Sequence, residues 1–371
     1  MTTTGTDSGR IRLGTRGSRL ALTQSGQVAE ALMAAGAPSE GSDARRDGLD
    51  IDLVTVRTDG DGDRTPLRQL GGVGVFAARL RRALLDGEVD LVVHSFKDLP
   101  TQPVEGLEVI CVPAREDPRD ALCARDGLTL ATLPEGARVG TGSPRRAAQL
   151  LAARPDLEVV DLRGNVPTRL ARVRGLEAVG VGTDEPVAPS RADATGDLDA
   201  VVLALSGLRR LGLEHFASEV LGLETMLPAP AQGALAVEAR AGECSTALAR
   251  AVAVLDDEPT RLAVTAERAL MSRLGAGCAA PVGAWAHLRG GGREPRVLAL
   301  RAVVTSLDGG REVGCELSTE LPEAAGGPDT PGDSAAAVRA AQALGVRVAE
   351  VLLEDGAADI VDLHADKPRR D

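Results

Sequence analysis

Apolar runs of strand length alternate with helical patterns as far as Pro228, and this alternation predicts an α/β fold. Helices are predicted behind the N-cap candidates Ser18, Ser143 and Asn165, and over residues 75–85. The predicted strands are residues 11–13, 51–56, 91–94 and 107–112, and then 138–139, 157–161 and 198–205. A second α/β unit is expected to begin near Asp117.

The pattern changes after Pro230 and predicts a small α+β part. Its expected elements are helices at 247–255, 259–274 and 335–353 and strands at 282–288, 297–306 and 312–318. Three stretches, at 38–48, 175–196 and 322–334, are rich in Gly, Pro, Asp and Ala, and we expect them to be solvent-exposed insertions.

Composition excludes several classes of protein. At 371 residues, the chain is long enough for two or three domains. A net charge of −12 and only four aromatic residues argue against nucleic-acid binding. The N-terminal segment lacks an apolar core and no stretch resembles a membrane span, so a cytoplasmic location is expected. Five scattered cysteines and four dispersed histidines argue against a disulfide framework and a zinc site.

Lysine is almost absent: of 42 basic residues, only Lys97 and Lys367 are lysines. Lys97 lies beside Asp98 and just after the apolar run 91–93, where a strand would deliver polar groups at its C-terminal edge. A compact cation next to a carboxylate there indicates a functional site, and an ordinary ion pair at a strand end is the alternative.

Arginines recur at the predicted helix starts. Gly140, Thr141, Gly142, Ser143 and Pro144 lead into Arg145 and Arg146, which combines a capped helix N-terminus with two guanidinium groups. The same arrangement recurs around Asn165, between Arg163 and Arg169, and further arginines follow predicted strands at Arg16, Arg209 and Arg210. Because guanidinium groups match carboxylate geometry, the repetition favours a ligand with many carboxylates over solvated surface charges.

Cys278 lies in a loop of small residues between a predicted helix and a strand, which gives its thiol steric access. A lone loop cysteine is more often inert than reactive, so its position in a loop leaves open whether this thiol is reactive. Cys111, Cys123 and Cys315 fall in or near strand patterns and are expected to be small core side chains.

Together these segments resemble the porphobilinogen deaminase family, also called hydroxymethylbilane synthases. The matching segments, in order, are 15–22, 93–99, 115–121, 139–146, 162–169, 205–213, 231–234, 264–270 and 277–283. The resemblance implies two α/β domains like the lobes of periplasmic binding proteins plus a small C-terminal α+β domain. The implied boundaries are 1–113 with 232–252, then 117–228, then 256–371.

The resemblance also implies a reaction: four porphobilinogen molecules condense head to tail with loss of ammonia, and hydrolysis releases hydroxymethylbilane. It implies a dipyrromethane cofactor joined by a thioether to Cys278, a monomeric enzyme, and catalytic roles for Asp98, Lys97 and Arg16. Cofactor and substrate binding is implied for Ser18, Phe76, Ser95, Thr141, Ser143, Arg145, Arg146, Arg163, Arg169, Arg210 and Gln232. The chain departs from many family members at Val73, where they carry a lysine.

Two other functions remain open at this point. A cytoplasmic two-lobed anion-binding or sensor protein would explain the arginines, but it would not require Cys278. A Schiff-base enzyme would explain Lys97, although the neighbouring Asp98 favours the protonated, non-nucleophilic form of that amine.

Overall fold

A computed structural model describes residues 10–37, 48–56, 75–176, 196–277, 279–291, 294–322 and 331–363. Most of the three predicted insertions lies outside these residues. One correction concerns the last of them, because helix α9 (Pro331–Glu354) begins inside the stretch predicted as an insertion. Within the described part of the chain, no helix is long and apolar enough to cross a membrane.

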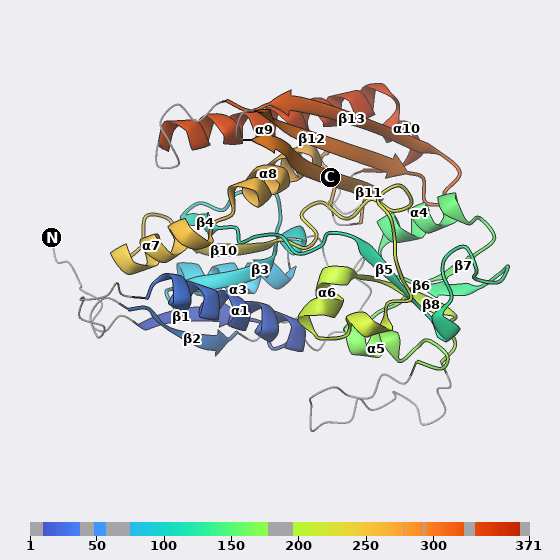
Figure 1. The fold of residues 1–371 in the computed structure, drawn as a ribbon, viewed down its shortest axis with the longest axis horizontal. Helices are drawn as coiled ribbons and strands as arrows, with labels where there is room; N and C mark the ends of the chain where they lie inside the picture. Colours follow the sequence, from blue (N-terminus) through green and yellow to red (C-terminus); the bar gives the residue numbers. More distant parts are fainter. Residues whose placement is uncertain are drawn as a thin grey trace, which may run out of the picture. The chain divides into compact units, whose positions relative to one another are not determined.

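The chain forms two compact units, each assembled from two separate stretches of sequence. Unit 1 comprises residues 1–115 and 234–261, and unit 2 comprises residues 116–233 and 262–371. Each unit contains a five-stranded mixed sheet, and unit 2 also holds a three-stranded antiparallel sheet with its helices (Figure 1). The predicted fold class, two α/β parts followed by a small α+β part, is confirmed.

The sheet of unit 1 has the strand order β2-β1-β3-β10-β4. These strands are β2 (Asp50–Thr55), β1 (Arg10–Thr15), β3 (Leu91–Ser95), β10 (Leu235–Arg240) and β4 (Leu107–Cys111). Strands β1, β2 and β3 are parallel, whereas β10 runs antiparallel to both of its neighbours. Strand β10 was not among the strands predicted from the sequence, although it lies within residues 232–252, which the resemblance assigned to the first domain.

Helices cover both faces of this sheet. Helices α1 (Arg19–Ala35) and α7 (Thr246–Leu255) pack on one face, against Leu91, Val93 and Val237. Helix α3 (Val75–Leu85) packs on the other face through Leu80 and Leu84, against Val92. Successive residues of β3 therefore point alternately toward α1 and toward α3.

The sheet of unit 2 repeats this arrangement, with strand order β7-β6-β8-β5-β9. Its strands are β7 (Glu158–Val160), β6 (Arg138–Gly140), β8 (Ala200–Ala204), β5 (Asp120–Ala124) and β9 (Glu219–Val220). Strands β7, β6 and β8 are parallel, and β5 runs antiparallel between β8 and β9. In both sheets the antiparallel strand occupies the fourth place, and both of these strands were missed in the sequence.

Three short helices follow the parallel strands of unit 2: α4 (Pro144–Ala153) after β6, α5 (Val166–Leu170) after β7, and α6 (Leu205–Arg210) after β8. Leu205, which was predicted to end a strand, begins α6 instead.

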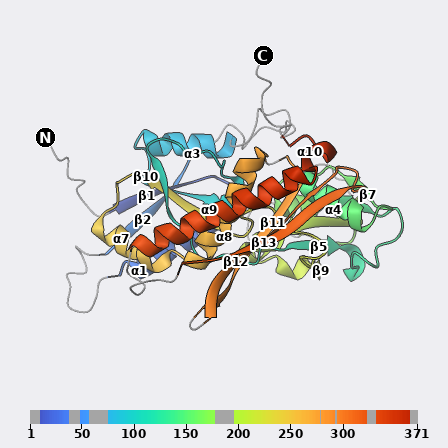
Figure 2. The same ribbon diagram turned by 90° about the horizontal axis from the view of Figure 1, so that it is seen from above.

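The C-terminal part is a three-stranded sheet covered on one face by two helices (Figure 2). Its strands are β11 (Val282–Gly291), β12 (Glu294–Thr305) and β13 (Glu312–Glu320), and its long helices are α8 (Glu258–Leu274) and α9, followed by the short α10 (Ala357–Ile360). Alternate residues of β12, including Leu298 and Leu300, point into the core beneath α8 and α9.

Candidate active site

In unit 1, the candidate residues lie at the C-terminal edge of the parallel strands. Strands β1 and β3 are parallel neighbours, so the turn after Thr15 and the turn after Ser95 lie at the same edge of the sheet. The first turn carries Arg16 and Ser18, and Ser18 caps α1 by accepting a hydrogen bond from the Ala21 amide at 3.3 Å. The predicted N-cap is thus confirmed.

Strand β3 runs directly into a short 3₁₀ helix, Phe96–Asp98. Asp98 is exposed and Lys97 is half-buried. The backbone just before them is held by a hydrogen bond that the Phe96 amide donates to the Ala234 carbonyl at 3.0 Å. Ser95 points toward α1 and donates its hydroxyl hydrogen to Gln24 Oε1 at 3.1 Å. The segment therefore presents an exposed carboxylate just after a strand end whose backbone bonds to the β10 side and whose Ser95 side chain bonds to α1.

In unit 2, two capped turns lie side by side, because β6 and β7 are parallel neighbours. Ser143 caps α4 through a hydrogen bond from the Arg146 amide, and Asn165 caps α5 through one from the Thr168 amide. The Ser143 amide in turn donates to Thr141 Oγ1 at 3.2 Å. The two turns therefore lie next to one another.

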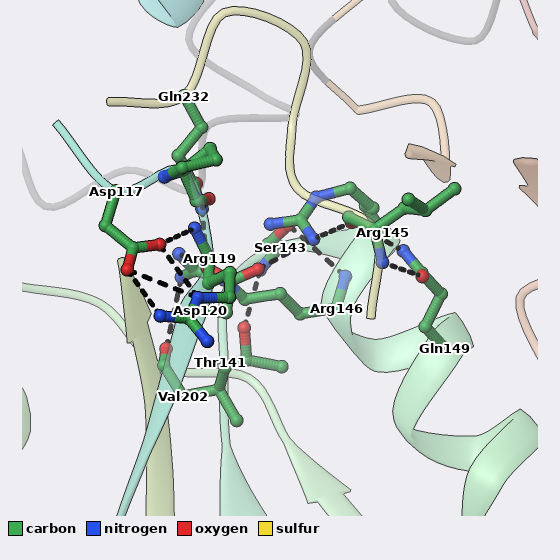
Figure 3. A network of polar contacts seen from close by, with 12 residues as sticks. Asp117, Arg119, Asp120, Thr141, Ser143, Arg145, Arg146, Gln149, Val202 and Gln232 are labelled. Atoms are coloured by element: carbon green, nitrogen blue, oxygen red, sulfur yellow. Dashed lines mark hydrogen bonds and ion pairs between the residues drawn. The ribbon is translucent and has the colours of Figure 1, made fainter. Parts of the chain in front are cut away.

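A buried carboxylate, Asp120, lies at the centre of the unit 2 cluster (Figure 3). Its Oδ2 lies 2.8 Å from Arg145 Nη1, its Oδ1 lies 2.7 Å from Arg146 Nη2, and Gln232 Nε2 donates to Oδ1 at 2.8 Å. Because β5 is antiparallel, its first residue lies at the edge where the parallel strands end. Asp120 was not singled out in the sequence, although the apolar run that follows it was an available strand signal.

Asp120 thus gives Arg145 and Arg146 an internal counter-charge. Both side chains are buried, and both also donate to backbone carbonyls, Arg145 to Leu227 at 2.6 Å and Arg146 to Val202 at 3.1 Å. Gln149 donates to the same Leu227 carbonyl at 3.1 Å (Figure 3). The two arginines are therefore held rigidly, and part of their charge is already balanced.

The balance of charge in this cluster remains positive. Burial alone would raise the pKa of the Asp120 carboxyl, but the charges of Arg145 and Arg146 outweigh it and hold that pKa below its ordinary value. Burial, together with the neighbouring charges of Arg146 and Arg163, lowers the pKa of Arg169 to about 10. The cluster is thus short of negative charge.

Two buried donors in this cluster also lack acceptors. The Nε–H groups of Arg145 and Arg163 have no hydrogen-bond partner among the described residues. An unpaired buried donor is costly, so these groups favour an anionic ligand with several acceptor oxygens.

The remaining candidates are placed as follows. Arg210, at the end of α6, donates to the Gly233 carbonyl at 2.6 Å, and burial lowers its pKa. Gln232 lies next to Gly233 and ties Pro118 to Asp120 through its side-chain amide. Phe76 lies in the first turn of α3, but its side chain lies outside what the structure describes. Cys278 also lies outside the described residues, although its loop does lie between α8 and β11 as predicted.

Comparison with known families decides the identity of the chain. Residues 11–247 match the family model described as "Porphobilinogen deaminase, dipyromethane cofactor binding domain". Residues 261–354 match the one described as "Porphobilinogen deaminase, C-terminal domain". The chain belongs to the porphobilinogen deaminase family.

Individual relatives agree with this membership in the porphobilinogen deaminase family. The chain is 53% identical over 357 residues to a porphobilinogen deaminase from Cutibacterium acnes, which covers 96% of this chain and 98% of that protein. It is 51% identical over 368 residues to one from Micrococcus luteus, with 94% and 93% covered. Among solved structures, a periplasmic substrate-binding protein from Coxiella burnetii matches at 16% identity with a TM-score of 0.38, covering 66% of this chain and 91% of that one.

Proposed function

We propose that the protein is a porphobilinogen deaminase that condenses four porphobilinogen molecules head to tail, releasing ammonia at each step, and then releases hydroxymethylbilane by hydrolysis. The single observation that supports this most strongly is the positive cluster of unit 2, with its unpartnered Arg145 and Arg163 donors. Each pyrrole of such a substrate carries an acetate and a propionate arm, so a growing chain supplies the carboxylates that this cluster lacks.

The same cluster fits a dipyrromethane cofactor, whose two pyrroles carry the same carboxylate arms. Its proposed attachment is a thioether to Cys278, and when bound it supplies the pyrrole α-carbon to which the first substrate is joined. The residues proposed to hold its arms and those of the substrate are Thr141, Ser143, Arg145, Arg146, Arg163, Arg169 and Arg210, with Gln232 orienting Asp120 behind them. Ser18, Ser95 and Phe76 are proposed to complete the binding set from unit 1.

Asp98 is proposed to be the central catalytic residue. When ammonia leaves porphobilinogen, its bonding electron pair goes with it and the remaining methylene-pyrrole carries a positive charge. The exposed Asp98 carboxylate can accept hydrogen bonds from pyrrole N–H groups and stabilise that charge. Lys97 is proposed to bind pyrrole carboxylates, and Arg16 to orient the leaving amine or the incoming water.

The finer statements about the whole protein belong to the same proposal. We propose a cytoplasmic monomer that binds no nucleic acid, with the three domains 1–113 with 232–252, 117–228 and 256–371. The net charge of −12 and the scarcity of aromatic residues support the part of this proposal that concerns nucleic acid.

The test combines turnover with intact mass. Purified protein given porphobilinogen should release bilane, and its mass should exceed the sequence mass by two pyrrole units. The Cys278→Ser variant should lose both properties, whereas Cys244→Ser, which alters an exposed thiol, should keep both. Borohydride treatment should leave no adduct on Lys97. An unmodified protein that is fully active would contradict the thioether, and absence of turnover by the parent protein would contradict the proposed activity.

A further inference from the structure

Three ionisable side chains are buried together beneath helix α3, apart from the residues assigned above. Glu238 of β10 is 2% exposed, His94 of β3 is 7% exposed and Arg81 of α3 is 9% exposed. Arg81 Nε lies 3.0 Å from both carboxylate oxygens of Glu238, and Arg81 Nη2 donates to Oε1 at 2.8 Å. His94 Nε2 lies 3.2 Å from Glu238 Oε2. We call these residues the α3 triad.

Stability alone is a weak explanation for the α3 triad. Its neighbours on this face of the sheet are apolar, including Val92, Leu80 and Leu84. Removing two charges from water carries a large desolvation penalty, and well-packed apolar residues in place of a buried ion pair are often equally stable. An apolar cluster does not fix the orientation of the strand relative to the helix. The forked guanidinium of Arg81 can do so, because it engages the carboxylate in one geometry.

The end of β3 is the part of the sheet where a fixed orientation matters most. Strand β3 pairs with β1 only through Leu91 and Val92. Beyond Val92, the backbone of β3 pairs with β10 alone, as far as Ser95 opposite Leu235. The catalytic segment Phe96–Asp98 follows at once. The strand end that carries the proposed catalytic residues is therefore held by a sheet partner on one side only.

We propose that Glu238 is a positioning residue that, through Arg81 and His94, locks the end of β3 against α3 and so fixes Lys97 and Asp98 in their reactive geometry. Glu238 and His94 lie on the same face of neighbouring strands, because Glu238 is two residues from Ala236, the direct partner of His94. Arg81 then fixes the carboxylate from the helix above. This inference rests on the proposed function, since its role is defined by turnover of porphobilinogen.

The first variant to test is Arg81→Lys, which keeps the positive charge and loses the fork. We expect kcat to fall by at least about tenfold, because small displacements of a catalytic group are costly. KM for porphobilinogen should change little, since the carboxylate-binding arginines are untouched. The matched control is Arg79→Lys on the same helix, whose partner Glu88 is 49% exposed, and its kcat should equal that of the parent.

A second variant separates positioning from stability. Glu238→Gln alone leaves Arg81 buried without a counter-charge and should lower the melting temperature. Combining it with Arg81→Met removes both charges and keeps an acceptor for His94, so the melting temperature should recover while kcat stays low. Turnover is counted per folded molecule whose mass includes the cofactor. Parental kcat in either Arg81→Lys or the double variant overturns the inference while the proposed function stands; an inactive parent overturns both.

Discussion

At the scale of single residues, two aspartates lie at the edges where the parallel strands of the two sheets end, and their surroundings differ. Asp120 is fully buried between two guanidinium groups and serves as their internal counter-charge. Asp98 is exposed at the end of β3 and so remains accessible to a ligand. The sequence indicated Asp98 through its neighbour Lys97, whereas Asp120 became recognisable only once β5 was placed beside β8.

The Asp98 assignment predicts that charge matters more than shape. Asp98→Asn keeps the size of the side chain but loses its charge, whereas Asp98→Glu keeps the charge and moves it by one methylene. Loss of a preorganised electrostatic interaction should cost roughly 3 to 4 kcal/mol, so the asparagine variant should be slower by about a hundred to a thousand times. Bilane production at equal cofactor occupancy measures this, and Asp98→Glu should retain more activity. The control is Asp86→Asn, which alters an exposed ion pair with Arg82 just after the end of α3. Equal rates for Asp98→Asn and the parent protein would exclude the electrostatic role.

At the scale of elements, packing decides what each helix tolerates. Helix α9 approaches α8 so closely at Gly345 that a Cβ atom there would lie 2.1 Å from the Ala266 carbonyl oxygen. Helix α1 also contains a glycine, Gly26, but a Cβ atom there would meet nothing within 4 Å. Both positions look alike in the sequence, since each is a glycine inside a helical pattern.

Substituting alanine at these two glycines should therefore change stability in opposite directions. Gly26→Ala should stabilise the protein by up to about 1 kcal/mol, because alanine is the better helix former. Gly345→Ala gains the same propensity, but the clash with a backbone oxygen forces α8 and α9 apart, and overpacking typically costs about 1 to 3 kcal/mol. Denaturant unfolding of both variants beside the parent protein measures the difference. A stabilised Gly345→Ala variant would show that the two helices are not packed as closely as described.

At the scale of the whole molecule, each unit contains a buried ionic cluster that depends on an ionised carboxylate. Asp120 in unit 2 has a pKa held below its ordinary value by Arg145 and Arg146. Burial alone would raise the pKa of Glu238 in unit 1, but His94 and Arg81 outweigh it and lower that pKa. A carboxyl group with a lowered folded-state pKa contributes stability that is complete above its unfolded pKa, near 4, and is lost as the pH falls through the folded value.

Both units should accordingly lose stability in acid. Calorimetric melting temperatures at constant ionic strength should stay high near neutral pH and fall as the pH is lowered from about 5 toward 3. Asp120→Asn should be less stable at pH 7 by roughly 3 to 5 kcal/mol, because two buried guanidinium groups lose their counter-charge. It should also show a shallower acid dependence, since the titrating group is gone. An unchanged slope in this variant would mean that Asp120 does not contribute to acid unfolding.

The sequence by itself determined those features that depend on interactions between neighbouring residues, such as helix caps. The caps Ser18, Ser143 and Asn165 each bond to an amide three residues away, so their helices could be placed from neighbouring residues alone. The arginines at the ends of parallel strands were predictable for the same reason, because strand polarity places those ends at one edge of a sheet.

Only the tertiary structure decided which charges meet. Strands β5 and β10 each follow a point where the chain passes from one unit to the other, and each is antiparallel to its neighbours. No local signal in the sequence specifies which strands they pair with. Asp120 lies 26 residues from Arg146, and Glu238 lies 157 from Arg81. Ion pairs at such separations form only after the sheets are assembled. Burial then removes each carboxylate from water, and this desolvation is costly unless a positive charge lies beside it. The candidate residues could thus be picked out by type in the sequence, whereas the charge balance around them could not.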